Sequence, residues 1–149
     1  MKVKTILVPT DFSADADKAL ETAIDLARQF GAKIVLLHAY RIEVPLAYAG
    51  LDTGLVLPPT FQTQVDETAA KRVADLAKRT TQGGVEARGV ALCEPPSIAI
   101  VAEAERLPAD LIVIGTRGLT GLKHVVLGSV AERVIRHAPC PVLTVRTST

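Results

Sequence analysis

The sequence predicts an α/β fold in which a five-stranded parallel sheet carries helices on both faces. Short apolar runs without charge, such as residues 3–8 and 111–114, are typical of strands buried on both faces of a parallel sheet. Longer segments between them repeat apolar side chains at helical spacing. Strands that alternate with helices form right-handed βαβ units. The 149 residues therefore predict one doubly wound domain spanning residues 1–149.

The first part of the chain predicts a strand, a helix and a second strand. The first strand covers residues 3–8, and Asp11 or Ser13 is the expected N-cap of the helix that follows. Gly31 ends this helix, and residues 33–40 form the second strand. The face of the helix that we expect to point inward consists of Ala16, Ala19, Leu20, Ala23, Ile24, Ala27 and Phe30.

An irregular segment over residues 41–60 interrupts the alternation. It contains prolines and glycines, with Leu, Val and Tyr scattered between them. Long segments of this kind are uncommon in compact domains and often have a function. We expect a surface loop whose apolar side chains cover the sheet. The alternatives are a flap over a ligand and a surface that meets a partner.

The rest of the chain repeats the alternation of helices and strands. The predicted helices cover 61–80, 95–106 and 129–137, and the predicted strands cover 85–92, 110–114 and 142–145. The strand over 85–92 alternates charged with apolar residues, which favours an edge position in the sheet. The residues of the helix over 61–80 that we expect to point inward are Phe61, Val65, Ala69, Val73, Leu76 and Ala77.

Composition limits the classes of function. A net charge of +1 and 3% aromatic residues leave no basic, aromatic-rich patch, so we expect no nucleic-acid partner. The two cysteines form no Cys-x-x-Cys pair and have no His at ligand spacing, so no metal site is predicted. No apolar run approaches the roughly 18–20 residues that span a bilayer, and no signal-peptide core is present. We therefore expect no membrane partner and a cytoplasmic location.

A glycine-rich segment follows the fourth predicted strand. Gly115, Gly118 and Gly121 are three residues apart, and Gly128 with Ser129 opens the next helix. Glycines let backbone N–H groups converge on an anion, and a helix N-terminus adds free N–H groups and the positive end of its dipole. The spacing matches neither a Walker A motif nor the dinucleotide fingerprint. Two interpretations of this segment are therefore open: a phosphate cradle, or a βα turn that serves packing alone.

The spacing Gly115-x2-Gly118-x9-Gly128-Ser129 resembles the nucleotide-binding signature of the universal stress protein family. Residues 6–13 (Ile-Leu-Val-Pro-Thr-Asp-Phe-Ser), 36–38 and 138–145 resemble the first, second and last strands of that family, so the resemblance extends from about residue 3 to residue 146. It implies an adenine-nucleotide α-hydrolase-like fold with strand order 3-2-1-4-5. Ligands of such sheets bind where the strand order reverses, here beyond the first and fourth strands.

The resemblance implies ATP as the ligand, possibly with Mg²⁺, and it assigns roles residue by residue. Pro9, Thr10 and Asp11 would line the adenine and ribose side, and Ala39 would pack near the base. Asp11 is also the carboxylate that could contact a nucleotide-bound Mg²⁺. The residues that would bind the ribose and phosphates, mainly through backbone N–H groups, are Gly115, Thr116, Arg117, Gly118, Leu119, Thr120, Gly121, Gly128, Ser129, Val130 and Ala131.

Several of these residues have a second explanation. Asp11 is equally well explained as a helix N-cap, and Arg117, Lys123 and His124 as solvated side chains. His38 is expected to be a hydrogen-bonded histidine of the core. The turn over residues 93–97, where the family often carries a Gly before its Pro, is expected to lie away from the cradle.

The resemblance implies a nucleotide-binding stress or regulatory module, and a homodimer formed through the last strand, Val142–Arg146. No second acid accompanies Asp11, so the sequence predicts no catalytic residue and at most slow hydrolysis of ATP. Two alternatives are open. One is an enzyme of the adenine-nucleotide α-hydrolase-like class that transfers adenylyl or phosphoryl groups, and the other is a nucleotide-free interaction protein.

Overall fold

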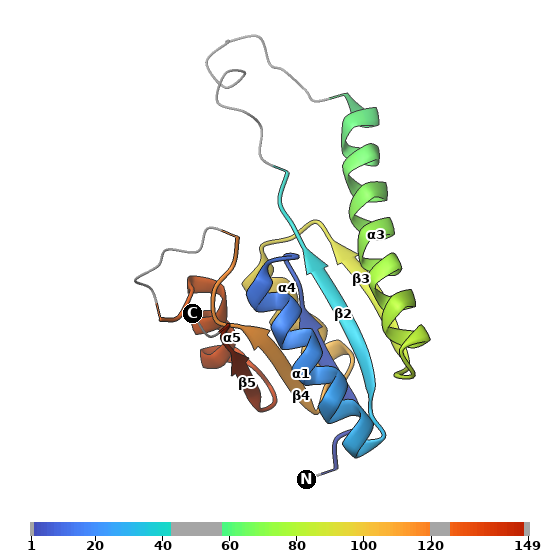
Figure 1. The fold of residues 1–149 in the computed structure, drawn as a ribbon. Helices are drawn as coiled ribbons and strands as arrows, with labels where there is room; N and C mark the ends of the chain where they lie inside the picture. Colours follow the sequence, from blue (N-terminus) through green and yellow to red (C-terminus); the bar gives the residue numbers. More distant parts are fainter. Residues whose placement is uncertain (1, 43–57, 120–125, 148–149) are drawn as a thin grey trace.

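The computed structural model describes residues 2–42, 58–119 and 126–147, and it contains a parallel sheet between two layers of helices (Figure 1). The sheet order is β3-β2-β1-β4-β5, and every neighbouring pair is parallel. The predicted fold class and strand order are therefore confirmed. The strands are β1 (Thr5–Pro9), β2 (Lys33–Ala39), β3 (Ala87–Leu92), β4 (Leu111–Gly115) and β5 (Val142–Val145).

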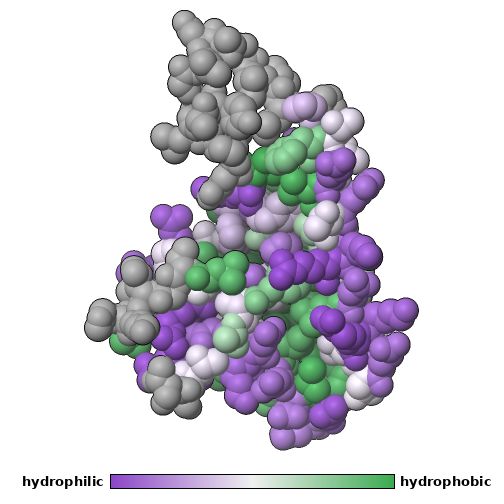
Figure 2. Space-filling view, turned by 45° about the horizontal axis from the view of Figure 1, so that its top comes forward, coloured by the Kyte–Doolittle hydropathy of each residue, from purple (hydrophilic) through white to green (hydrophobic). Residues whose placement is uncertain are grey.

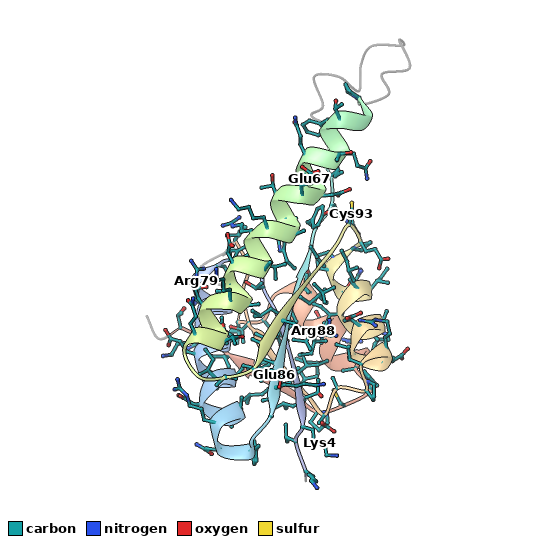
Figure 3. All side chains as sticks on the ribbon, turned by 90° about the vertical axis from the view of Figure 1, so that its right-hand side faces the viewer. Lys4, Glu67, Arg79, Glu86, Arg88 and Cys93 are labelled. Atoms are coloured by element: carbon teal, nitrogen blue, oxygen red, sulfur yellow. The ribbon has the colours of Figure 1, made fainter. Side chains whose placement is uncertain are left out.

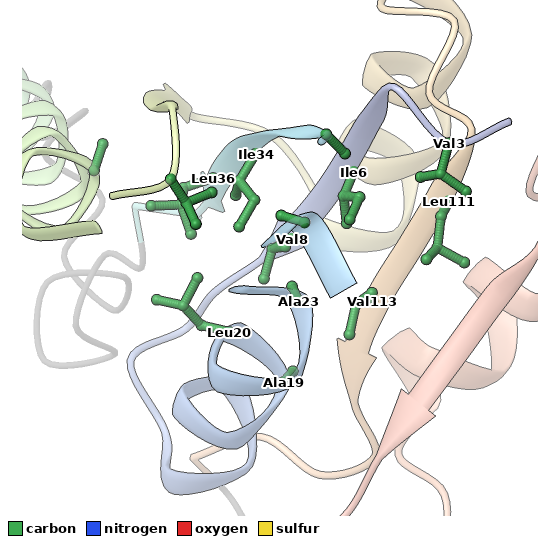
Figure 4. Packing of buried hydrophobic residues seen from close by; sticks show 14 of the residues in the cluster. Val3, Ile6, Val8, Ala19, Leu20, Ala23, Ile34, Leu36, Leu111 and Val113 are labelled. Carbon is green, nitrogen blue, oxygen red and sulfur yellow. The ribbon is translucent and has the colours of Figure 1, made fainter. Parts of the chain in front are cut away.

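The helices are α1 (Ala14–Phe30), α3 (Pro59–Gln82), α4 (Pro96–Arg106) and α5 (Ser129–His137). Side chains alternate between the two faces of each strand, so each face has its own apolar core. On one face Ile6 and Val8 of β1 pack with Ala19 and Leu20 of α1, and α3 extends this layer (Figure 4). On the other face the strands pack against α4 and α5.

The edges of the sheet are β3 and β5, as the composition of residues 85–92 predicts for β3. Ser13 caps α1 through a bond from the Ala16 N–H to Ser13 Oγ (3.3 Å), so Asp11 is not the cap. Gly31 ends α1 with φ +65°. None of the described helices combines the length and the apolar character that a bilayer crossing requires.

Two phenylalanines differ from the expected inward faces. Phe30 is 48% exposed and Phe61 is 41% exposed. Phe30 is the last residue of α1, so no further turn of this helix covers its side chain. Phe61 lies in the first turn of α3. Helix α3 has 24 residues and β3 has six, so the N-terminal end of α3 extends beyond the sheet and the turn at Cys93 (Figure 3). Within the irregular segment, residues 43–57 lie outside the described residues, and α3 begins two residues before the predicted helix.

Candidate functional site

A cavity of about 440 Å³ lies at the carboxyl ends of β1 and β4, where the strand order reverses. The predicted site residues that line it are Pro9, Thr10, Asp11, Ala39, Gly115, Thr116, Arg117, Gly118, Leu119, Ser129, Val130 and Ala131. Gly128 is not among the lining residues. Thr120 and Gly121, with Lys123 and His124, lie outside the described residues.

The cavity also has lining residues that the sequence did not predict, namely Ala16, Leu37, Pro96, Ile100 and Ile114. Leu37 could have been found from the alternation of side chains along β2, because it shares a face with Ala39. Pro96 overturns the expectation that the turn over residues 93–97 lies away from the cradle. Helix α4 begins at this turn. It packs against α5 and β2, on the face of the sheet that holds the cavity.

The turn between β1 and α1 forms one wall of the cavity. Asp11 accepts hydrogen bonds through both carboxylate oxygens, Oδ1 from the Ser13 N–H (3.0 Å) and Oδ2 from the Leu119 N–H (3.0 Å). The Thr10 N–H donates to the Leu37 carbonyl (2.8 Å). Asp11 therefore joins the turn after β1 to the loop after β4.

A buried carboxylate, Asp15 in the first turn of α1, fixes the start of the loop after β4. Asp15 Oδ2 accepts from Thr116 Oγ1 (3.2 Å), from the Arg117 N–H (3.1 Å) and from Arg117 Nε (3.3 Å). Its Oδ1 accepts from the Thr147 N–H (3.3 Å). Burial favours the neutral acid, but the hydrogen bonds from Thr147, Thr116 and Arg117 outweigh it and lower the pKa of Asp15.

The pairing of Arg117 answers one question that the sequence left open. Its guanidinium is paired within the protein, because Nε contacts Asp15 and the terminal nitrogen donates to Thr147 Oγ1 (3.3 Å). Sequence reasoning missed Asp15 because an acid in the first turn of a helix is ordinary.

The glycines of the loop make room for the protein's own atoms. A Cβ on Gly115 would lie 2.8 Å from the backbone carbonyl carbon of Asp15, and one on Gly118 would lie 2.6 Å from Asp11 Oδ2. Neither glycine has a positive φ, so close approach explains their presence, and the expected conformational freedom does not. Both contacts bring the loop against the turn and the helix that follow β1.

Three amides of the loop that were expected to bind phosphate already have partners within the protein. The Thr116 N–H donates to the Val145 carbonyl (2.9 Å), and those of Arg117 and Leu119 donate to Asp15 and Asp11. These three N–H groups are therefore not free donors in the structure. A ligand that used the Leu119 N–H would have to displace the Asp11 carboxylate.

The start of α5 offers donors of a different kind. Gly128 is its N-cap, no side chain caps it, and its first intrahelical bond runs from the Glu132 N–H to the Gly128 carbonyl (3.0 Å). The N–H groups of Ser129, Val130 and Ala131 precede that bond and have no acceptor within the helix. These three residues line the cavity. A helix start of this kind attracts anions.

Another part of the cavity lining is apolar, formed by Leu37 and Ala39 of β2, Ile100 of α4 and Ile114 of β4. Figure 2 brings the carboxyl ends of the strands toward the viewer and shows apolar residues reaching the surface in the middle of this face. The arrangement combines an apolar slot with an anion-attracting helix start, in a volume typical of small-molecule sites.

The fold and the position of the cavity define a doubly wound α/β protein whose candidate site lies where the strand order reverses. The sequence profile of the universal stress protein family matches residues 2–146. The chain belongs to this family.

Known proteins of similar sequence and structure agree with this assignment. Universal stress protein MJ0531 of Methanocaldococcus jannaschii is 36% identical over 143 residues, which cover 96% of this chain and 82% of that protein. The solved structure of hypothetical protein MJ0577 superposes with a TM-score of 0.82 at 28% identity, and it covers 100% of this chain and 99% of its own.

Two further solved structures contain nucleotides. A universal stress protein in complex with cAMP has a TM-score of 0.65 at 26% identity, covering 99% of this chain and 100% of its own. The universal stress protein from Archaeoglobus fulgidus in complex with dAMP has a TM-score of 0.62 at 26% identity, covering 97% of this chain and 99% of its own.

Proposed function

We propose that this chain binds an adenine nucleotide, ATP in the first place, in the cavity at the carboxyl ends of β1 and β4. The observation that carries the proposal is the start of α5, where three N–H groups without intrahelical acceptors line the same cavity as an apolar slot. The complexes of related proteins with cAMP and dAMP support the same class of ligand. Occupancy would serve a regulatory role in the stress response.

The lining residues suit the parts of a nucleotide. Leu37, Ala39 and Ile100 offer apolar surface to the base, while Ser129 and the N–H groups of Val130 and Ala131 face the phosphates. Asp11 lies in the wall of the cavity, where its carboxylate could contact the ribose or a nucleotide-bound Mg²⁺. Any such contact through Oδ2 competes with the Leu119 N–H.

Slow or absent hydrolysis is part of the proposal. Rapid phosphoryl transfer needs a positioned base or water and positive charge at the γ-phosphate. Both oxygens of Asp11 accept backbone N–H groups, and the guanidinium of Arg117 donates to Asp15 and Thr147. These contacts hold Asp11 and Arg117 in structural pairs, away from the roles of base and phosphate-binding cation.

One observation favours a second candidate, an interaction protein that binds no nucleotide. Gly115 is required by the backbone of Asp15, and Gly118 makes room for the Asp11 carboxylate. The glycine spacing would therefore persist in a protein whose loop served packing alone.

A proline at the first position of α5 separates the two candidates. Gly128 has φ −72° and ψ 158°, a conformation that a following proline accepts, and proline is well tolerated at the first residue of a helix. Ser129→Pro thus removes one N–H group and the hydroxyl from the cavity, and Ser129→Ala removes the hydroxyl alone. Titration calorimetry with AMP, ATP and adenosine then measures the contribution of the N–H group.

Nucleotide binding through α5 predicts that Ser129→Pro weakens AMP and ATP by about tenfold relative to Ser129→Ala, the equivalent of one charge-assisted hydrogen bond. Adenosine, which has no phosphate, should bind both variants equally. A wild-type protein that gives no binding heat with any of the three would support the interaction protein instead.

A further inference from the structure

The turn between β1 and α1 contains a residue in an unusual conformation. Phe12 has φ +61°, and among the described residues it is the only non-glycine residue with a positive φ. A bulky side chain is a genuine outlier in the left-handed region, and such a conformation persists only where the surroundings hold it. Phe12 follows Asp11 directly, so whatever holds its ring also fixes a wall of the cavity.

Two side chains hold the ring of Phe12. The guanidinium carbon of Arg72 lies 3.9 Å from the ring centroid, a cation–π contact. The His38 ring lies 4.7 Å from it, and His38 Nδ1 lies 2.9 Å from the Thr10 carbonyl oxygen. A carbonyl oxygen only accepts hydrogen bonds, so Nδ1 donates this one. The turn is held from the α3 side of the sheet.

The helix that supplies Arg72 makes a second contact with the same cluster. Asp66 of α3 accepts a hydrogen bond from the Tyr40 hydroxyl (2.5 Å), and the Tyr40 ring stacks on His38 with centroids 5.5 Å apart. No residue of α3 appears among those lining the cavity. Among the described residues, α3 is linked to the cavity wall through Phe12 and His38, and Phe12 is the one adjacent to Asp11.

We propose that Arg72 is a positioning residue for the nucleotide site. By holding the ring of Phe12 in the left-handed turn, it keeps the Asp11 carboxylate in the wall of the cavity, where Oδ2 accepts the Leu119 N–H (3.0 Å). Ligand affinity then depends on how α3 sits on the sheet, although α3 does not touch the ligand. This inference rests on the proposed function, since it assigns Asp11 to the wall of a nucleotide site.

Arg72→Met removes the cation and keeps an unbranched side chain. Arg79→Met is the matched control, because Arg79 is an exposed arginine in the last turn of the same helix (Figure 3). Arg72→Lys restores a cation over the ring. AMP binding is measured by titration calorimetry, and the Leu119 amide resonance is recorded by NMR without added ligand.

We expect Arg72→Met to raise the dissociation constant for AMP about two- to fivefold, the range of a cation–π contact at an exposed site. Arg72→Lys should recover most of the affinity. The Leu119 amide should shift in Arg72→Met and stay in place in Arg79→Met, a difference that general destabilisation would not produce at equal thermal stability.

Equal AMP affinity and an equal Leu119 resonance in the two methionine variants would overturn the role of Arg72. If the wild-type protein binds no nucleotide, the proposed function fails. In that case the Leu119 resonance alone decides whether Arg72 positions the turn.

Discussion

Asp15 is the carboxylate on which the geometry of the loop after β4 depends, and Asp15→Asn tests this. The asparagine keeps the shape of the side chain but offers one acceptor oxygen in place of two. Its single oxygen can accept the hydrogen bonds from Thr147 or those from Thr116 and Arg117, but not both sets. It also removes the charge opposite Arg117, whose side chain is 20% exposed and so regains part of its hydration.

Removing one partner of a fully buried ion pair costs roughly 3–5 kcal/mol, and the partial exposure of Arg117 reduces this to about 2–3 kcal/mol. For a chain of this size the loss corresponds to a melting temperature lower by roughly 4–12 °C. Urea unfolding and thermal unfolding at neutral pH measure it. Asp17→Asn is the control, because Asp17 is an exposed acid in the same first turn and shares the interaction with the helix dipole.

The dependence on pH gives a second check. The pKa of Asp15 is lower in the folded protein, so its stabilisation is fully present above the unfolded value and disappears as the pH falls through the folded value. The gap in unfolding free energy between wild type and Asp15→Asn should be constant above about pH 5 and shrink below about pH 4. A gap no larger than that of Asp17→Asn at pH 7 would refute the reasoning.

Four further predictions concern the loop glycines, the apolar slot and the edge strand β5. Gly115→Ala should destabilise the fold by about 1–3 kcal/mol in urea unfolding, because its Cβ meets the backbone of Asp15. Gly118→Ala should change stability by less than about 1 kcal/mol, because its Cβ meets only the end of the Asp11 side chain, yet weaken AMP roughly tenfold in calorimetry, because the displaced carboxylate changes the wall of the cavity that both residues line. Ala39→Phe should weaken AMP by at least about tenfold by filling the apolar slot, while Ala102→Phe on the exposed side of α4 should not. We also propose a homodimer through β5, an edge strand whose Leu143 is 38% exposed; light scattering should give twice the 15.8 kDa of one chain for wild type and one chain for Leu143→Arg.

The sequence predicts the strands of the sheet because they follow from local patterns, and the place of the cavity follows once the resemblance supplies the strand order. Uncharged runs such as 111–114 are typical of central strands, and the strand order then brings the ends of β1 and β4 together. The resemblance to the family added the strand order and most of the lining residues. Pro96 and Ile100 were missed because the placement of α4 over the sheet depends on packing that no motif encodes.

The contacts that shape the loop could not be predicted from the sequence. Asp15 meets Thr116 across 101 residues and Thr147 across 132 residues, and nothing in the local sequence connects them. The positive φ of Phe12 has no signal either, because an aromatic residue is among the least expected there. Both depend on elements that become neighbours only in the folded sheet.

The two halves of the signature differ in what they say about a ligand. Gly115 is required by the backbone of Asp15, and a Cβ on Gly118 would meet the Asp11 carboxylate, so internal contacts account for these two glycines even if the cavity bound nothing. Gly128 also packs closely, since its Cβ would lie 3.1 Å from the Thr116 carbonyl oxygen, but the next three residues of α5 differ. Among the described residues no side chain caps the helix, and Ser129, Val130 and Ala131 line the cavity. An anion is the simplest partner for their N–H groups. Substitutions at the glycines therefore test the packing of the loop first, while Ser129→Pro tests the ligand directly.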